Sequence, residues 1–110
     1  MDDLIRNLEK EKVLSLEEKV DYEKGQVVSL TITQRPGVGI TLFAFDKDEE
    51  ISSHAAPGDA FVTVLDGAGE FTIDGKPHIV KKGESIIMPV GIPHAVKAIE
   101  RFKMLLVLVK

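Results

Sequence analysis

The sequence predicts an all-β protein, a β-sandwich or barrel, on three observations. Short stretches rich in Val, Ile, Thr and Phe recur along residues 20–110. Many of them alternate apolar and polar residues with the period of two that a half-buried strand requires. Turn signals such as Pro36-Gly37 and Asp74-Gly75 separate them. About eight to ten short strands at this spacing are typical of two antiparallel sheets packed face to face.

The individual strands follow from where the alternating runs begin and end. We expect strands at residues 27–33, 39–45, 60–65, 70–73, 77–80, 85–88, 95–99 and 102–109. Asp74-Gly75 is a strong signal for a two-residue hairpin. Residues 46–59 are expected to form a loop with a solvated acidic tip at 46–50. The last two strands would form a hairpin around Glu100 and Arg101.

The N-terminal residues have a different pattern. Leu4, Ile5 and Leu8 recur at helical spacing among charged residues, which predicts a short amphipathic helix within residues 2–12. Ser15, followed by Glu17, is a candidate cap for a further short turn. We therefore expect one domain, residues 1–110, with a helical or irregular extension over 1–19 and a barrel over 20–110.

Composition excludes several classes of protein. The net charge is −4 and no basic cluster is present, which argues against a nucleic-acid partner. Without cysteine there is no disulfide framework and no thiolate metal site. No run approaches the length of a membrane span, and residues 1–19 lack the apolar core of a secretory signal. We expect a cytoplasmic protein with no membrane partner.

The last expected strand is apolar on both faces. Residues 104–109 read Met-Leu-Leu-Val-Leu-Val, whereas a strand with one solvated face should alternate. Two explanations remain open: a subunit contact, as in a homodimer, or cover by the N-terminal segment of the same chain.

The richest motif is the run from Gly83 to His94, which reads GESIIMPVGIPH. It resembles the second motif of the cupin family, G-x5-P-x-G-x2-H-x3-N, at every fixed position up to His94; the final Asn is replaced by Ala98. Over about residues 38–109 the chain looks like a small single-domain cupin of the RmlC-like type. The resemblance implies a jelly-roll β-barrel of two antiparallel sheets, commonly a homodimer, with a pocket between the sheets.

The first cupin motif, G-x5-H-x-H-x3-4-E-x6-G, is only partly present. His54 stands at its first His position, but the second His is Ala56 and the Glu is Ala60. In the family these residues and the His of the second motif hold a divalent Fe, Mn, Ni or Zn ion. Here His54 and His94 are the candidate metal ligands, an incomplete set below the three of a catalytic site. We expect no organic cofactor.

Each histidine also has a structural explanation. His94 would face the pocket, or it would be kept for packing and a buried hydrogen bond. His54 is a ligand or a solvated loop residue, and His78 is structural or exposed. Ser53 and Asp59 lie beside the vacant positions, but neighbours on a strand point to opposite faces.

Two functions are compatible with these residues. In the first, the protein binds a small molecule in the barrel pocket, with at most a weak two-histidine metal site. In the alternative, it is a metal-dependent oxygenase or isomerase acting on a small organic acid or sugar derivative, with catalytic residues that the sequence does not identify. The absent His and Glu favour the first, and the fold alone does not decide.

Overall fold

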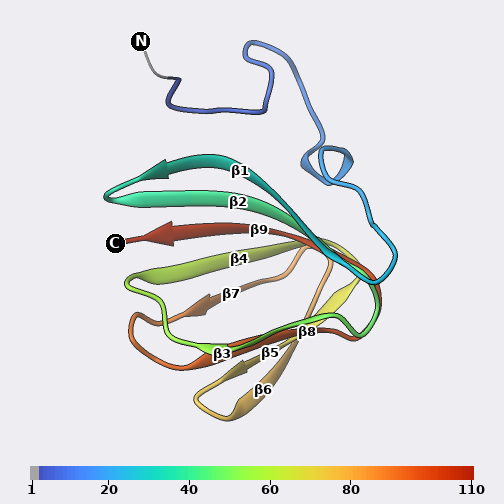
Figure 1. The fold of residues 1–110 in the computed structure, drawn as a ribbon, viewed down its shortest axis with the longest axis vertical. Coiled ribbons are helices and arrows are strands. Elements are labelled where there is room, and N and C mark those ends of the chain that lie inside the picture. Colours follow the sequence, from blue (N-terminus) through green and yellow to red (C-terminus); the bar gives the residue numbers. More distant parts are fainter. Residues whose placement is uncertain (1–2) are drawn as a thin grey trace.

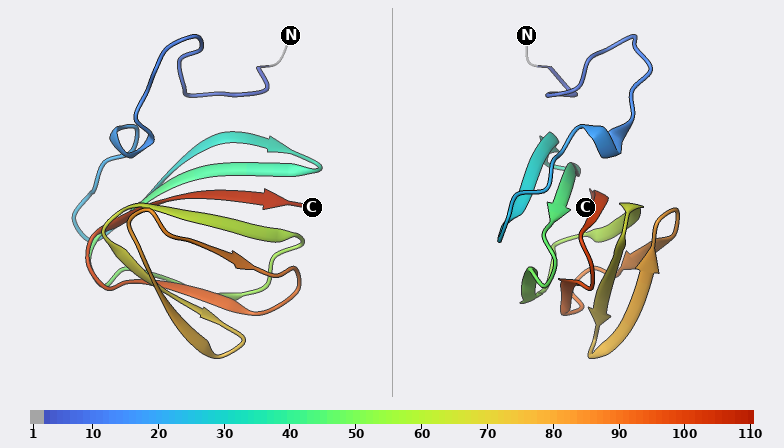
Figure 2. Two further views of the ribbon diagram at one scale, coloured as in Figure 1. Left: turned by 180° about the vertical axis from the view of Figure 1, so that it is seen from behind. Right: turned by 90° about the vertical axis from the view of Figure 1, so that its right-hand side faces the viewer.

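The computed structural model describes residues 3–110, which form two antiparallel β-sheets facing each other (Figures 1 and 2). The strands are β1 (Val27–Arg35), β2 (Val38–Phe45), β3 (Glu50–His54), β4 (Asp59–Asp66), β5 (Ala68–Ile73), β6 (Lys76–Lys81), β7 (Ser85–Met88), β8 (His94–Ala98) and β9 (Phe102–Val109). One sheet has the order β1-β2-β9-β4-β7, and the other has the order β3-β8-β5-β6. The predicted all-β jelly roll is confirmed.

Strand β9 lies in the middle of the five-stranded sheet, between β2 and β4 (Figure 1). Its inward side chains Phe102 and Met104 are buried in the core between the two sheets. On its other face, Leu105 packs in a second apolar cluster outside the sheet. The central position explains why this strand is apolar on both faces.

Three aromatic rings pack together in the core around Phe102. Its ring stacks on Phe45 with centroids 4.5 Å apart, and it meets Phe71 edge-on at 6.0 Å. Such pairs stabilise a core beyond the area they bury. The Phe102 ring also lies against Gly69, where a Cβ would stand 2.8 Å from its Cζ atom. A glycine is therefore required at that point of β5.

The predicted N-terminal helix is wrong for the described residues 3–12, which are irregular. Asn7 and Glu11 have positive φ angles, which an α-helix does not accept. The chain instead bonds to the edge of β1: the Arg6 amide donates to the Ile32 carbonyl at 2.8 Å. Only the short turn η1 (Leu16–Glu18) forms, without a side-chain cap from Ser15. Within residues 3–110, no helix is long and apolar enough to cross a membrane.

The N-terminal segment covers part of the outer face of the five-stranded sheet. Its side chains Leu8, Leu16 and Val20 pack on Leu42 and Leu105, in the second apolar cluster. One of the two explanations for the apolar outer face, cover by the same chain, therefore holds for this part of the sheet. The rest of the face is uncovered in the single chain, and the subunit contact stays a prediction.

Two other expectations for the strands are wrong. Residues 50–54, expected to lie in a loop, form β3, which pairs with β8. The last two strands do not form a hairpin, because β8 lies in the four-stranded sheet and β9 in the five-stranded one. The connection around Glu100 and Arg101 crosses from one sheet to the other.

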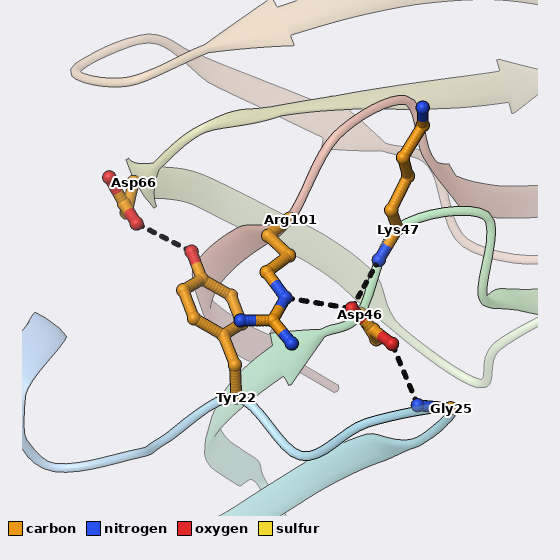
Figure 3. Close-up of polar contacts among 6 residues, drawn as sticks. All are labelled: Tyr22, Gly25, Asp46, Lys47, Asp66 and Arg101. Atoms are coloured by element: carbon orange, nitrogen blue, oxygen red, sulfur yellow. Dashed lines mark hydrogen bonds and ion pairs between the residues drawn. The ribbon is translucent and has the colours of Figure 1, made fainter.

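A polar cluster ties the N-terminal segment to that connection (Figure 3). The Tyr22 hydroxyl donates to Asp66 at 2.5 Å, and burial, followed by this bond, raises the pKa of Tyr22. Arg101 donates to Asp46 at 2.8 Å, and Asp46 also accepts from the Gly25 amide. The Gly25 amide, then Arg101, lowers the pKa of Asp46 to about 2. Asp46 is therefore a structural acceptor rather than part of a solvated loop tip.

Two glycines allow a matched test of the contact between the turn before β5 and the connection before β9. Gly67 and Gly75 both have positive φ, 70° and 77°, so alanine would strain both backbones by about 1 kcal/mol. A Cβ at Gly67 would overlap the Arg101 carbonyl oxygen, whereas nothing lies within 4 Å of one at Gly75. We expect Gly67→Ala to lower the free energy of unfolding in urea by about 2 kcal/mol more than Gly75→Ala. Equal losses would show that the turn at Gly67 does not lie against the Arg101 carbonyl.

Candidate functional site

The structure brings His54 and His94 side by side. His54 is the last residue of β3 and His94 the first of β8, and the two are paired in the register between these strands. Paired residues point to the same face of a sheet. Their ring centroids lie 4.5 Å apart, with the ring planes inclined by 66°. The two histidines that the sequence selects thus form one site.

The turn between β7 and β8 holds His94 in this place. After Met88 the chain passes through Pro89 and Gly91, and Gly91 has a φ of 72°. The Gly91 amide donates to the Ala56 carbonyl at 3.0 Å. The Val90 amide donates to Asp59 Oδ1 at 2.8 Å. The two motif regions are therefore joined by hydrogen bonds, and Asp59 holds the turn instead of facing the pocket.

The histidine pair lines a cavity of about 180 Å³ inside the barrel. The lining residues are Phe43, Ile51, His54, Ala56, Ala60, Met88, His94, Val96, Met104, Leu106 and Leu108. No acidic or basic side chain other than the two histidines is among them. The cavity is thus mainly apolar, and its two imidazoles differ: His94 is buried, whereas His54 is exposed to solvent at the end of β3.

Each imidazole is oriented by a backbone carbonyl two residues earlier. Nδ1 of His54 lies 3.0 Å from the Ser52 oxygen, and Nδ1 of His94 lies 3.2 Å from the Ile92 oxygen. A carbonyl can only accept, so both Nδ1 atoms carry the proton and donate. The remaining nitrogen, Nε2, has no hydrogen bond to any residue of 3–110. This is the arrangement that commonly orients a histidine for a ligand at Nε2.

The Nε2 atom of His94 opens on the cavity. His94 is only 3% exposed, yet within residues 3–110 no fully buried side-chain nitrogen or oxygen lacks a hydrogen-bond partner. Since Nε2 has no partner, it must keep some accessible surface, and the cavity is what the residue lines. Burial lowers the pKa of His94, the bond to Ile92 opposes this, and the nearby His54 lowers the pKa further. At neutral pH His94 therefore offers a lone pair.

The residues present do not fit the divalent ion that the cupin motifs imply. Ala56 and Ala60 line the cavity where the family has a His and a Glu, and a methyl group has no lone pair. In the part of the chain that the structure describes, no three His, Cys, Asp or Glu side chains come together to hold a metal. His78 is exposed on β6 and outside the cavity, as expected. His54 and His94 remain candidate ligands without a third partner of these types.

A second hollow lies on the solvent side of the four-stranded sheet. It has about 270 Å³ and is lined by residues such as Glu50, Ser52, Glu70, Thr72 and Lys97. It contains no histidine and is more open to solvent than the interior cavity. The candidate site is therefore the interior cavity.

Comparison with known proteins agrees with this architecture. The model of the Cupin domain family matches residues 41–109, more than half of the chain. The chain belongs to the cupin family. No curated protein matches this cupin.

Solved structures show the same fold. A conserved protein of unknown function from Streptococcus pyogenes is 50% identical, with a TM-score of 0.96, over 99% of this chain and 96% of that one. A cupin 2 conserved barrel domain protein from Leptotrichia buccalis is 52% identical, with a TM-score of 0.87, over 88% of this cupin but only 47% of its own length. A cupin superfamily protein from Desulfitobacterium hafniense is 28% identical, with a TM-score of 0.91, over 96% of each chain.

Sequence reasoning missed the two methionines of the cavity. Met88 and Met104 are each 2% exposed and both line it. Met88 lies inside the second cupin motif, and Met104 begins the apolar run of β9, so each reads as ordinary core. They differ from other core residues only because they line the same cavity as the two histidines.

The lowered pKa of His94 predicts how stability depends on pH. The folded state binds a proton less readily than the unfolded state, whose ordinary pKa is 6.5. The stability that neutral His94 contributes is complete above pH 6.5 and is lost as the pH falls through the folded pKa. In urea unfolding, we expect the advantage of the wild type over His94→Asn to shrink between pH 7.5 and 5. The exposed His78→Asn is the control, and parallel pH profiles of wild type and His94→Asn would contradict the assignment.

Proposed function

We propose that this cupin binds a small, mostly apolar molecule inside its barrel and orients it by a hydrogen bond to the histidine pair. The observation that carries the proposal is the Nε2 atom of His94, which is held open on an apolar cavity. A small number of placed polar groups in a mainly apolar pocket is the usual design of a ligand site.

The size of the cavity limits the ligand. At about 180 Å³ it is smaller than the roughly 300–1,000 Å³ of pockets for drug-sized molecules. Aliphatic side chains and Phe43 form most of its wall. A single ring or a short chain of carbon atoms is the class of molecule that such a space accepts.

The polarity of the site selects the group that the ligand must carry. Because Nδ1 of each ring donates to a carbonyl, the neutral ring presents only an acceptor at Nε2. An acceptor binds a hydroxyl or amine donor and repels a carboxylate. We therefore favour a small alcohol or phenol over an organic acid anion.

The alternative, a metal-dependent oxygenase or isomerase, has no comparable support in this site. It would need a third protein ligand, and Ala56 and Ala60 do not provide one. We therefore assign no catalytic residue.

Three molecules of similar shape test the proposal: phenol, toluene and benzoate. Binding is followed by the backbone amide NMR shifts of cavity residues at pH 8. We expect phenol to bind more tightly than toluene by about three- to tenfold, the value of one hydrogen bond, and benzoate to bind weakest. In His94→Leu, phenol and toluene should bind alike.

His78→Leu is the matched control, because this histidine lies outside the cavity, and it should keep the preference for phenol. If none of the three molecules shifts the cavity signals, the cavity is not a binding site. If benzoate binds as well as phenol, the acceptor argument is wrong.

We also propose that the protein is a homodimer through the uncovered part of the five-stranded sheet. There Val107, Phe61 and Ile87 form one row of cross-strand neighbours over β9, β4 and β7. Phe61 and Ile87 are 44% and 54% exposed in the single chain. A continuous apolar row of this kind is typical of a protein contact.

Light scattering tests the dimer. We expect a dimer mass at micromolar concentration for the wild type and a monomer mass for Phe61→Lys/Ile87→Lys, because the charges would be buried in the contact. Ile79→Lys, at a similarly exposed position in the other sheet, should remain dimeric. A monomeric wild type across the micromolar range would remove the proposal.

A further inference from the structure

Two thioethers share the cavity with the two imidazoles. Met88 of β7 and Met104 of β9 both line it, and both are buried. The chain has three methionines, so two of them converge on the same small space. A hydrogen bond to a hydroxyl ligand uses neither sulfur atom. Both methionines belong to the hydrophobic core, and both also border the space on which Nε2 of His94 opens.

The four side chains come from the two sheets and line the same cavity. His54 and His94 end and begin strands of the four-stranded sheet, while Met88 and Met104 belong to the five-stranded sheet. Met88 is the cross-strand partner of Ala60, the position where the first cupin motif has its Glu. A thioether therefore stands next to the place that lacks a carboxylate.

The character of these donors selects the ion. Thioether sulfur and imidazole nitrogen are soft to borderline ligands, and thioethers select Cu(I) among the biological metals. Oxygen ligands, which Mg²⁺, Ca²⁺ and Mn²⁺ prefer, are not among the side chains that line the cavity.

Charge points to the same ion. No acidic side chain lines the cavity, so an ion would bring its full charge into a mainly apolar space. The Born cost of this transfer grows with the square of the charge, so a divalent ion costs about four times as much as a monovalent one. Loss of the carboxylate thus acts against Fe, Mn, Ni and Zn more strongly than against Cu(I).

We propose that the cavity binds one Cu(I) ion, held by Nε2 of His54, Nε2 of His94 and one or both thioether sulfurs of Met88 and Met104. The proposal rests on the same cavity as the proposed function and names a second class of ligand for it, a soft monovalent cation. Both classes use the same property, the two Nε2 atoms that have no hydrogen bond within residues 3–110, at the wall of a mainly apolar cavity.

The test uses the full chain without an affinity tag. Cu(I) is titrated anaerobically against the chelator bicinchoninate, and Zn(II) is titrated against a chromophoric chelator of its own. We expect one equivalent of Cu(I), bound more tightly than Zn(II). Met88→Leu/Met104→Leu and His94→Leu should each weaken Cu(I) binding by at least about tenfold, a loss that even outer-shell partners of a metal can cause. His78→Leu should leave the affinity unchanged.

X-ray absorption at the copper edge gives a second readout that needs no variant. Protein labelled with selenomethionine should show a selenium scatterer in the first shell of copper, because the label replaces the sulfur of Met88 and Met104. Thermal unfolding checks that the Leu variants fold, which a swap of similar volume normally allows.

Four results would overturn the proposal: no Cu(I) retained against the chelator, Zn(II) bound more tightly than Cu(I), no selenium near copper, or equal affinity in the wild type and the double Leu variant. The phenol titration distinguishes this failure from failure of the proposed function. Phenol binding without Cu(I) binding removes only the copper site, and Cu(I) binding without phenol binding removes only the organic ligand.

Discussion

The contact between the two sheets at Phe102 is the constraint on which the rest of the barrel depends. Phe102 begins β9 in one sheet, and its ring lies against Gly69 of β5 in the other. Stacking on Phe45 and the edge contact with Phe71 fill the space around it. At Gly69 no side chain stands between the backbone of β5 and the Phe102 ring. Just before Phe102 the chain crosses from the four-stranded sheet to the five-stranded one.

The cavity lies further along β9 than the contact at Phe102. Along β9 the inward residues after Phe102 are Met104, Leu106 and Leu108, and all three line the cavity. The wall also includes Ala56 and, beside Leu108 in the same sheet, Ala60, side chains smaller than the ring and the carboxylate of the family motif. The substitutions that remove two expected metal ligands are thus the same ones that leave room for a ligand. At these two positions the same small side chains give the cavity its space and leave it without metal ligands.

Local sequence signals predict most of the fold. The features that depend on contacts between residues distant in sequence were not predicted. The turn at Asp74-Gly75 and the run from Gly83 to His94 specify their conformations within a few residues, and they form as predicted. Strand β3 was missed because Glu50–His54 is polar and its pairing partner β8 is distant in sequence. The helix expected within residues 2–12 does not form in residues 3–12, because the backbone there hydrogen-bonds to β1 instead. Likewise, no local pattern shows that Met88 and Met104 share a cavity with the histidine pair.

The orientation of the two histidines does not depend on a metal. Each ring is held by a carbonyl of its own strand or turn, at Ser52 and Ile92, so its Nε2 atom is positioned before a ligand arrives. Because Nε2 of neither ring bonds to a residue of 3–110, both nitrogens stay available to a ligand. The side chains that line the cavity include no carboxylate, and the thioethers among them are soft. They therefore suit a proton donor or a soft monovalent cation, and they do not suit the hard divalent ion of a complete cupin motif.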